Sequence, residues 1–77
     1  MTTLPEREPR TVTQIIHEGK FAAEVLITHH YDSDWSPSIA PIDIEKLERV
    51  RLALRRGDVK AAAKEAKVFE LLPLAGE

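Results

Sequence analysis

The sequence predicts an α+β fold, in which a small antiparallel sheet of three to four short strands carries two consecutive helices on one face, in the order β-β-(β)-α-α-β. Three observations predict it. Residues 21–28 alternate between apolar and polar side chains, as a half-buried strand does. Residues 47–54 place apolar side chains at helical spacing. Residues 68–72 form an apolar run that stops at Pro73, which is typical of a short final strand.

The length of 77 residues limits the chain to one small domain. Residues 1–10 carry two prolines among charged side chains and almost nothing apolar. We therefore expect a disordered tail there, followed by a single α+β domain over residues 11–74. A domain of this size buries only about 60% of its unfolded surface, so a partner or oligomerisation often supplements its stability.

The first half of the domain predicts a hairpin. Residues 11–16 are rich in β-branched side chains and suit an extended segment. Gly19 lies in the loop that follows, at residues 17–20, where it can adopt a positive φ. The apolar face of the next strand consists of Phe21, Ala23, Val25 and Ile27. Leu26 is an exception on the polar face. A helix over residues 21–26 is the alternative, because Ala, Glu and Leu favour helices, but Gly19 and the Val-Leu-Ile-Thr run favour the strand.

The centre of the chain predicts a turn and a short edge strand. Asp and Ser side chains at residues 31–34 favour the turn. Residues 35–39 can form only a short return strand, because Pro37 lacks the N–H that a central strand needs. Trp35 would add a large ring to the small core.

The second half predicts two helices that meet at a tight corner. Pro41 suits the first helical turn, and the apolar stripe of this helix consists of Leu47, Val50 and Leu54, with Ile44 at its edge. Gly57 fits the left-handed residue that ends a helix, and Asp58 fits the N-cap of the next. The stripe of the second helix consists of Val59, Ala62, Ala63 and Ala66, and Lys60, Lys64 and Glu65 face water. We expect the final strand, residues 68–72, to pair with the strand around Val25.

Composition excludes several classes of function. The chain has no cysteine, so it cannot hold a disulfide or a thiolate zinc site. No apolar run approaches the roughly 18 residues of a membrane span, and no N-terminal signal pattern is visible. We expect a cytoplasmic protein that contacts no membrane. No glycine-rich phosphate loop and no strained nucleophile turn occur, so we expect no cofactor and no enzymatic activity.

Two motifs suggest chemistry but have simpler explanations. A metal site at the end of the long strand would have to use His30, Asp32 and Asp34, yet the sequence after Asp34 lacks the third ligand and the glycine of a calcium loop. A polar strand end followed by a turn accounts for these residues, and we predict no metal. The tripeptide at residues 56–58 spells a cell-adhesion motif, but each residue already suits the helix–helix corner.

Charge is distributed unevenly along the chain. Residues 1–45 hold three basic and eight acidic side chains, whereas residues 46–77 hold eight basic and five acidic ones. Such asymmetry favours oriented docking. The candidate phosphate contacts on the helical half are Arg49, Arg55, Arg56, Lys60 and Lys64. Against nucleic-acid binding, the second helix offers no Asn, Gln or Arg to contact base edges, and aromatic residues are too few for base stacking.

Four residues are candidates for contacts with another protein. Leu52 projects opposite the apolar stripe of the first helix, among charged side chains. The others, in the central loop, are Asp32, Asp34 and Trp35. We therefore predict a non-catalytic protein-interaction module, antitoxin-like or an adaptor, with one specific protein partner or a homo-oligomeric state. A nucleic-acid-associated regulator that uses the basic helical face is the alternative.

Several motifs resemble those of a family of small uncharacterised bacterial proteins. That family carries a W-S-P step, here residues 35–37, and an A-L-R-x-G-D corner followed by V-[FY]-x-L-x-P, here residues 53–58 and 68–73. The resemblance covers residues 19–74 and implies no activity. The family opens its first helix with a Ser or Thr cap, from which the Ala40-Pro41 step departs. In size and acidic loop the chain is also similar to small antitoxins that bind a basic toxin.

Overall fold

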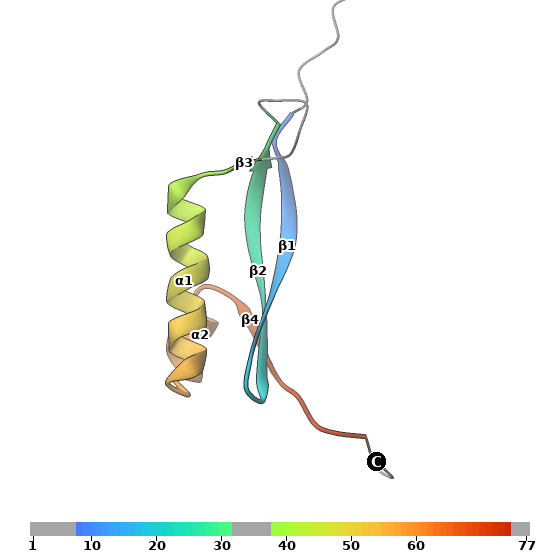
Figure 1. Ribbon diagram of the computed structural model, residues 1–77, viewed down its shortest axis with the longest axis vertical. Coiled ribbons are helices and arrows are strands. Elements are labelled where there is room, and N and C mark those ends of the chain that lie inside the picture. Colours follow the sequence, from blue (N-terminus) through green and yellow to red (C-terminus); the bar gives the residue numbers. More distant parts are fainter. Residues whose placement is uncertain (1–7, 32–37, 75–77) are drawn as a thin grey trace, which may run out of the picture.

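The computed structural model describes residues 8–31 and 38–74, which form a helix layer packed on one face of an antiparallel sheet (Figure 1). The elements in chain order are β1 (Arg10–Glu18), β2 (Phe21–His30), β3 (Ser38–Ile39), α1 (Pro41–Arg55), α2 (Val59–Ala63) and β4 (Lys67–Glu70). This is the predicted α+β architecture in the predicted order. Residues 1–7 of the predicted tail lie outside the described part, and Arg10, its last residue, already belongs to β1.

The hairpin of β1 and β2 is the longest feature of the sheet. Glu18 pairs with Phe21 across the two-residue turn, and the antiparallel register continues unbroken to Arg10 opposite His29. Gly19 adopts a φ of +59°, as predicted. A glycine with positive φ at the first turn position is typical of a type II′ turn, whose twist matches that of the flanking strands. The predicted strand over residues 21–28 is confirmed, and the alternative of a helix over residues 21–26 is wrong.

Both short strands lie along the same edge of β2, opposite β1. β4 pairs with the first residues of β2, from Phe21 to Glu24, as predicted for the final strand. β3 pairs with the last residues, His29 and His30. Between them, no strand within residues 8–31 and 38–74 pairs with residues 25–28 of β2 on this edge. The sheet therefore has a gap at its centre on one side.

α1 begins at Pro41 without a side-chain cap on Ala40, whose carbonyl accepts the N–H groups of Asp43 and Ile44. Its end forms a tight corner. Gly57 has a φ of +74°, its N–H donates to Leu54, and the N–H of the following residue donates to Ala53. This pair of hydrogen bonds is a Schellman motif. The side chain of Asp58 then accepts the N–H of Ala61 and caps α2, so the predicted corner is confirmed.

The second helix is shorter than predicted. α2 ends at Ala63, which is exposed, so the predicted stripe is wrong at Ala63. Ala66 lies beyond the helix but packs half-buried against the core, so its predicted inward position is confirmed. After Ala63 the backbone forms tighter turns of the 3₁₀ type, in which the N–H groups of Lys64 and Glu65 donate to the carbonyls three residues earlier. The physical reason is the register of β4, which must begin at Lys67 opposite Glu24 and leaves no room for another helical turn.

The final strand also ends earlier than predicted. β4 stops at Glu70, which faces Phe21, the first residue of β2. The N–H of Leu71 still donates to the turn carbonyl of Lys20 at 2.7 Å, but Leu71 and Leu72 are exposed. They leave the strand because the chain before Phe21 turns toward β1 and offers no further extended residues with which they could pair.

The core lies between the sheet and the helices. The sheet contributes Ile16, Ala23, Val25 and Ile27, and the helices contribute Val50, Ala53, Leu54 and Ala62, all at most 3% exposed. Half-buried apolar side chains pack around this cluster, among them Leu47 and Ala61. The predicted inward faces of β2 and α1 are therefore confirmed.

Candidate functional site

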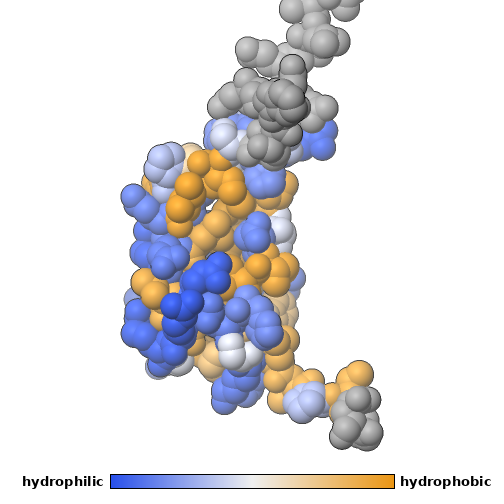
Figure 2. Space-filling model, viewed as in Figure 1, coloured by the Kyte–Doolittle hydropathy of each residue, from blue (hydrophilic) through white to orange (hydrophobic). Residues whose placement is uncertain are grey.

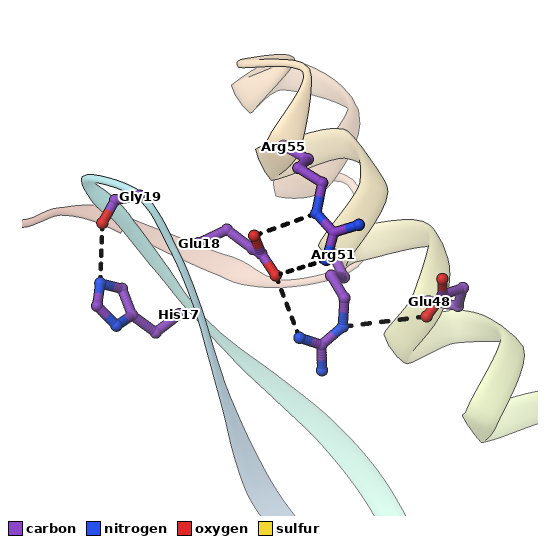
Figure 3. A network of polar contacts seen from close by, with 6 residues as sticks. All are labelled: His17, Glu18, Gly19, Glu48, Arg51 and Arg55. Atoms are coloured by element: carbon purple, nitrogen blue, oxygen red, sulfur yellow. Dashed lines mark hydrogen bonds and ion pairs between the residues drawn. The ribbon is translucent and has the colours of Figure 1, made fainter.

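A cluster of charged side chains ties the end of β1 to α1 (Figure 3). The carboxylate of Glu18 accepts hydrogen bonds from Arg55 Nε and Nη2 at 3.2 and 3.3 Å, and from Arg51 Nη1 at 3.2 Å. The bonds from Arg55 do most to lower the pKa of Glu18; partial burial opposes this, and Arg51 lowers it further. Arg51 also approaches Glu48 one turn earlier, at 3.9 Å. Both arginines are therefore neutralised by acids.

A second ion pair joins α1 to the segment after α2. Arg49 donates to both carboxylate oxygens of Glu65, from Nη2 at 2.6 Å and from Nε at 3.0 Å. This two-point contact lowers the pKa of Glu65 and raises that of Arg49. Sequence analysis placed Glu65 toward water, but its side chain is only 29% exposed because it lies against α1. The pair therefore fixes the chain between α2 and β4.

The candidate phosphate contacts do not form one free cationic surface. Arg49 and Arg55 bind glutamates, and Arg56 lies 3.5 Å from Asp58. Lys60 is exposed on α2 and Lys64 is exposed just after it. Because three of the five candidate cations already have acidic partners, the helical half attracts phosphate less than its composition indicates.

The candidate protein contacts are described only in part. Leu52 is 41% exposed on α1, as predicted. Asp32, Asp34 and Trp35 lie outside the described residues. The contacts predicted for the central loop therefore stay a prediction.

The face of the sheet that the helices leave uncovered carries large apolar side chains. Ile15 is 55% exposed, Leu26 is 57% exposed and Phe69 is 39% exposed. The register places all three on this face, because Leu26 lies opposite Thr13 and Phe69 lies opposite Ala22. We call the three side chains Ile15, Leu26 and Phe69 the outer apolar patch. Figure 2 shows apolar residues, coloured orange, across the middle of this view and along the side on which β1 and β2 lie.

No member of the outer apolar patch is predicted from the sequence as a contact residue. Leu26 stands out there only as an exception on the polar face of an alternating strand. Ile15 and Phe69 were missed, although the alternation of side chains along β1 and β4 could have separated each from its buried neighbour, Ile16 or Val68. The missing information was the register between strands, which decides which side of each strand the helices cover.

A hollow of about 360 Å³ lies beside Leu26. Its lining residues come from β1, β2, α1, the segment between α2 and β4, and the start of β4, and they are Thr13, Glu24, Leu26, Lys46, Glu65, Ala66 and Lys67. Lys46 reaches over the gap in the sheet, where its Nζ donates to the carbonyl of Leu26 at 3.0 Å. Asp43 accepts the N–H of Thr28 in the same gap at 3.0 Å. Side chains of α1 thus occupy the edge of β2 that lacks a strand.

Other kinds of site have little support within residues 8–31 and 38–74. These residues contain no group of three or more His, Asp or Glu side chains placed to hold a metal ion. His29 packs edge-on to Tyr31, with ring centres 6.4 Å apart. No helix in this part of the chain is long and apolar enough to cross a membrane.

Comparison with known proteins gives one short match. A stretch of 44 residues is 48% identical to part of an L-cysteine:1D-myo-inositol 2-amino-2-deoxy-alpha-D-glucopyranoside ligase from Brachybacterium faecium. The match covers 54% of this chain but only 11% of the ligase. No protein-family model matches the chain, and no solved structure matches it significantly.

Proposed function

We propose that this chain is a non-catalytic protein-interaction module that docks a partner protein on the uncovered face of its sheet. The observation that carries the proposal is the outer apolar patch, in which Ile15, Leu26 and Phe69 are each more than a third exposed on one face. Ile15 and Leu26 are diagonal neighbours across β1 and β2, and neighbouring exposed apolar side chains on one face of a small domain are typical of an interaction site. The partner presents apolar side chains of its own.

Charged groups beside the apolar side chains support an oriented complex. Glu24 lies opposite both Ile15 and Lys67, so this charged pair lies between Phe69 and the other two members of the patch, and Lys46 lies over the adjacent hollow. Charged groups within an interface set its specificity and association rate. A role as an adaptor or antitoxin-like partner of another bacterial protein fits this arrangement. The ligase match carries no activity to this chain, because it spans so little of that enzyme.

The alternative, a nucleic-acid-associated regulator, has weaker support. Binding through the helical half would have to use Lys60 and Lys64 or break the ion pairs of the arginines. Either way its affinity would fall steeply with salt, because phosphate contacts release counterions. Binding to the outer apolar patch would depend on salt only weakly.

The test is a pull-down of the tagged chain from host extract, with and without nuclease, read by mass spectrometry and repeated with matched variants. L26D and F69D place a charge in the outer apolar patch, whereas L52D places the same charge at an exposed leucine of α1. We expect one nuclease-resistant partner near equal stoichiometry, lost with L26D and F69D and retained with L52D. Loss with L52D alone would move the contact to α1, and recovery of nucleic acid that disappears at higher salt would favour the alternative.

A further inference from the structure

The outer edge of β1 is open along its whole length within the described residues, where β1 pairs with β2 alone (Figure 1). Glu18 and Phe21 flank the two-residue turn and so exchange hydrogen bonds with each other. Because bonding direction alternates along a strand, the even-numbered residues of β1 face β2. The N–H and C=O groups that point outward belong to Thr11, Thr13, Ile15 and His17.

This edge lacks the features that normally prevent strands from pairing with other chains. Residues 11–17 contain no Asp, Glu, Lys, Arg or Pro, and the register with β2 contains no bulge. The gap in the opposite edge of the sheet differs, since Asp43 accepts the N–H of Thr28 and Lys46 donates to the C=O of Leu26 there. One edge of the sheet is therefore protected by α1, and the other is left available.

We propose that a second copy of this chain pairs with β1 in antiparallel orientation, around a twofold axis at Gln14. Full overlap of the nine-residue strand requires this register, because Gln14 is its central residue. Arg10 of each copy then lies opposite Glu18 of the other. Glu8 lies just before β1 and Lys20 lies in the turn after it, where it pairs with Glu70 of its own chain at 3.4 Å, so the acidic Glu8 of one copy approaches the basic Lys20 of the other.

The charges at the strand ends select this register over its neighbours. Moving the axis to Thr13 would place Glu8 opposite Glu18, and moving it to Ile15 would place Arg10 opposite Lys20. Like charges directly opposite each other destabilise paired strands, whereas opposite charges stabilise them. The register centred on Gln14 thus combines the largest overlap with complementary ends.

The side chains along the edge fit the same arrangement. On the helix side, Val12 of one copy lies opposite Ile16 of the other, and the two Gln14 amides meet at the axis, where amides can donate to and accept from each other. On the uncovered side, Thr13 lies opposite Ile15 of the second copy, which makes the two Ile15 side chains diagonal neighbours. The outward-facing residues 11, 13, 15 and 17 form four hydrogen-bonded pairs with the other copy, and each pair exchanges two bonds, which gives about eight backbone hydrogen bonds. The dimer joins two sheets into one.

Cysteine trapping tests the register directly, because the chain has no cysteine of its own. Q14C places two thiols at the twofold axis. The two residues there form a non-hydrogen-bonded antiparallel pair, whose Cα atoms are about 4.5 Å apart, within the range of a disulfide. H17C is the matched control, since its symmetry mate lies about 20 Å away along the strand. We expect Q14C to form a covalent dimer under mild oxidation much faster than H17C. Equal rates would overturn the proposal.

Sedimentation equilibrium tests whether the edge itself makes the contact. The chain has a mass of 8.7 kDa, and we expect the wild type to approach twice that mass as concentration rises. T13P removes an outward N–H without removing a bond to β2, and should weaken the dimer about 10- to 100-fold. A wild type that stays at the monomer mass, or a dimer unaffected by T13P in a variant whose circular dichroism is unchanged, would overturn the proposal.

Charge reversal tests the ends. R10E places two glutamates opposite each other at both ends and should weaken the dimer about ten-fold, whereas K60E makes the same change of charge on α2 and should not. Glu8→Lys and Lys20→Glu should each weaken the dimer, and the double variant should restore it. Failure of that restoration would contradict the register.

The proposed dimer does not rest on the proposed binding of a partner protein. L26D and F69D test the outer apolar patch, whereas T13P and Q14C test the outer edge of β1.

Discussion

Asp43 in α1 accepts the backbone N–H of Thr28 in β2 at 3.0 Å, across the gap that β3 and β4 leave on the edge of the sheet. Asp43 lies in the first turn of α1, at the positive end of the helix dipole, where acidic side chains are favoured. The structure adds a second role. The same carboxylate replaces the strand that would otherwise pair with Thr28, so it joins the helix layer to the open edge of the sheet.

We expect D43A to destabilise the fold by about 1–2 kcal/mol, because it leaves a half-buried N–H without a partner. D43N should lose less, since its amide oxygen can still accept. E45A is the control, because Glu45 is an exposed acid in the same part of α1. Urea denaturation of the four proteins checks this, and equal midpoints for D43A and E45A would contradict the role of Asp43 at the gap.

We expect the contribution of Glu18 to stability to depend on pH. The pKa of Glu18 is lowered in the folded state by Arg55 and Arg51, so the folded state binds fewer protons than the unfolded state near that pKa. The contribution is therefore fully present above the unfolded pKa of about 4.3 and is lost as pH falls through the folded pKa. The urea midpoint of E18Q should lie below wild type at pH 7, and the difference should shrink below about pH 4.

The control for Glu18 is E48Q. Glu48 is 59% exposed and contacts Arg51 only at 3.9 Å, and such surface pairs contribute little. We expect its midpoint to follow wild type across the same pH range. A difference between E18Q and wild type that persists unchanged to pH 2.5 would show that the ion pairs are not its source.

We expect G57A to destabilise the fold by about 1 kcal/mol, because Gly57 holds a φ of +74° that residues with a side chain rarely adopt. An added methyl group would meet no atom within 4 Å, so the cost is conformational and not steric. G57N should lose less, since Asn tolerates the left-handed region. Thermal unfolding checks the order, and G57A equal to wild type would argue against the corner geometry.

Two alanines of α2 should respond differently to the same enlargement. Ala62 is fully buried against the core, whereas Ala63 is exposed. We expect A62L to overpack the interface and destabilise the fold by about 1–3 kcal/mol, and A63L to change stability by less than about 0.5 kcal/mol. Guanidinium denaturation of both variants measures the difference. A similar loss in both would mean that α2 continues beyond Ala63 and buries the stripe that the sequence alone predicts.

The sequence predicts best what neighbouring residues decide. Alternation along residues 21–28 identifies the buried face of β2, because successive side chains of a strand point to opposite faces. Gly57 and Asp58 identify the corner, because left-handed backbone and N-capping are local requirements. The end of α2 and the end of β4 were placed too late, since both depend on where β2 begins and on its register with β4.

The fold class, the inward faces of β2 and α1, and the helix–helix corner follow from the sequence alone. Which side chains are free to act depends on the packing of elements against one another. The sequence makes Arg55 a candidate phosphate contact, but in the structure its guanidinium binds Glu18, which lies 37 positions earlier in the chain. Ile15 looked like an ordinary strand residue until the register placed it with Leu26 and Phe69 on the uncovered face. Periodicity within one element cannot supply such information, because charge pairing and sheet coverage are set by residues distant in sequence.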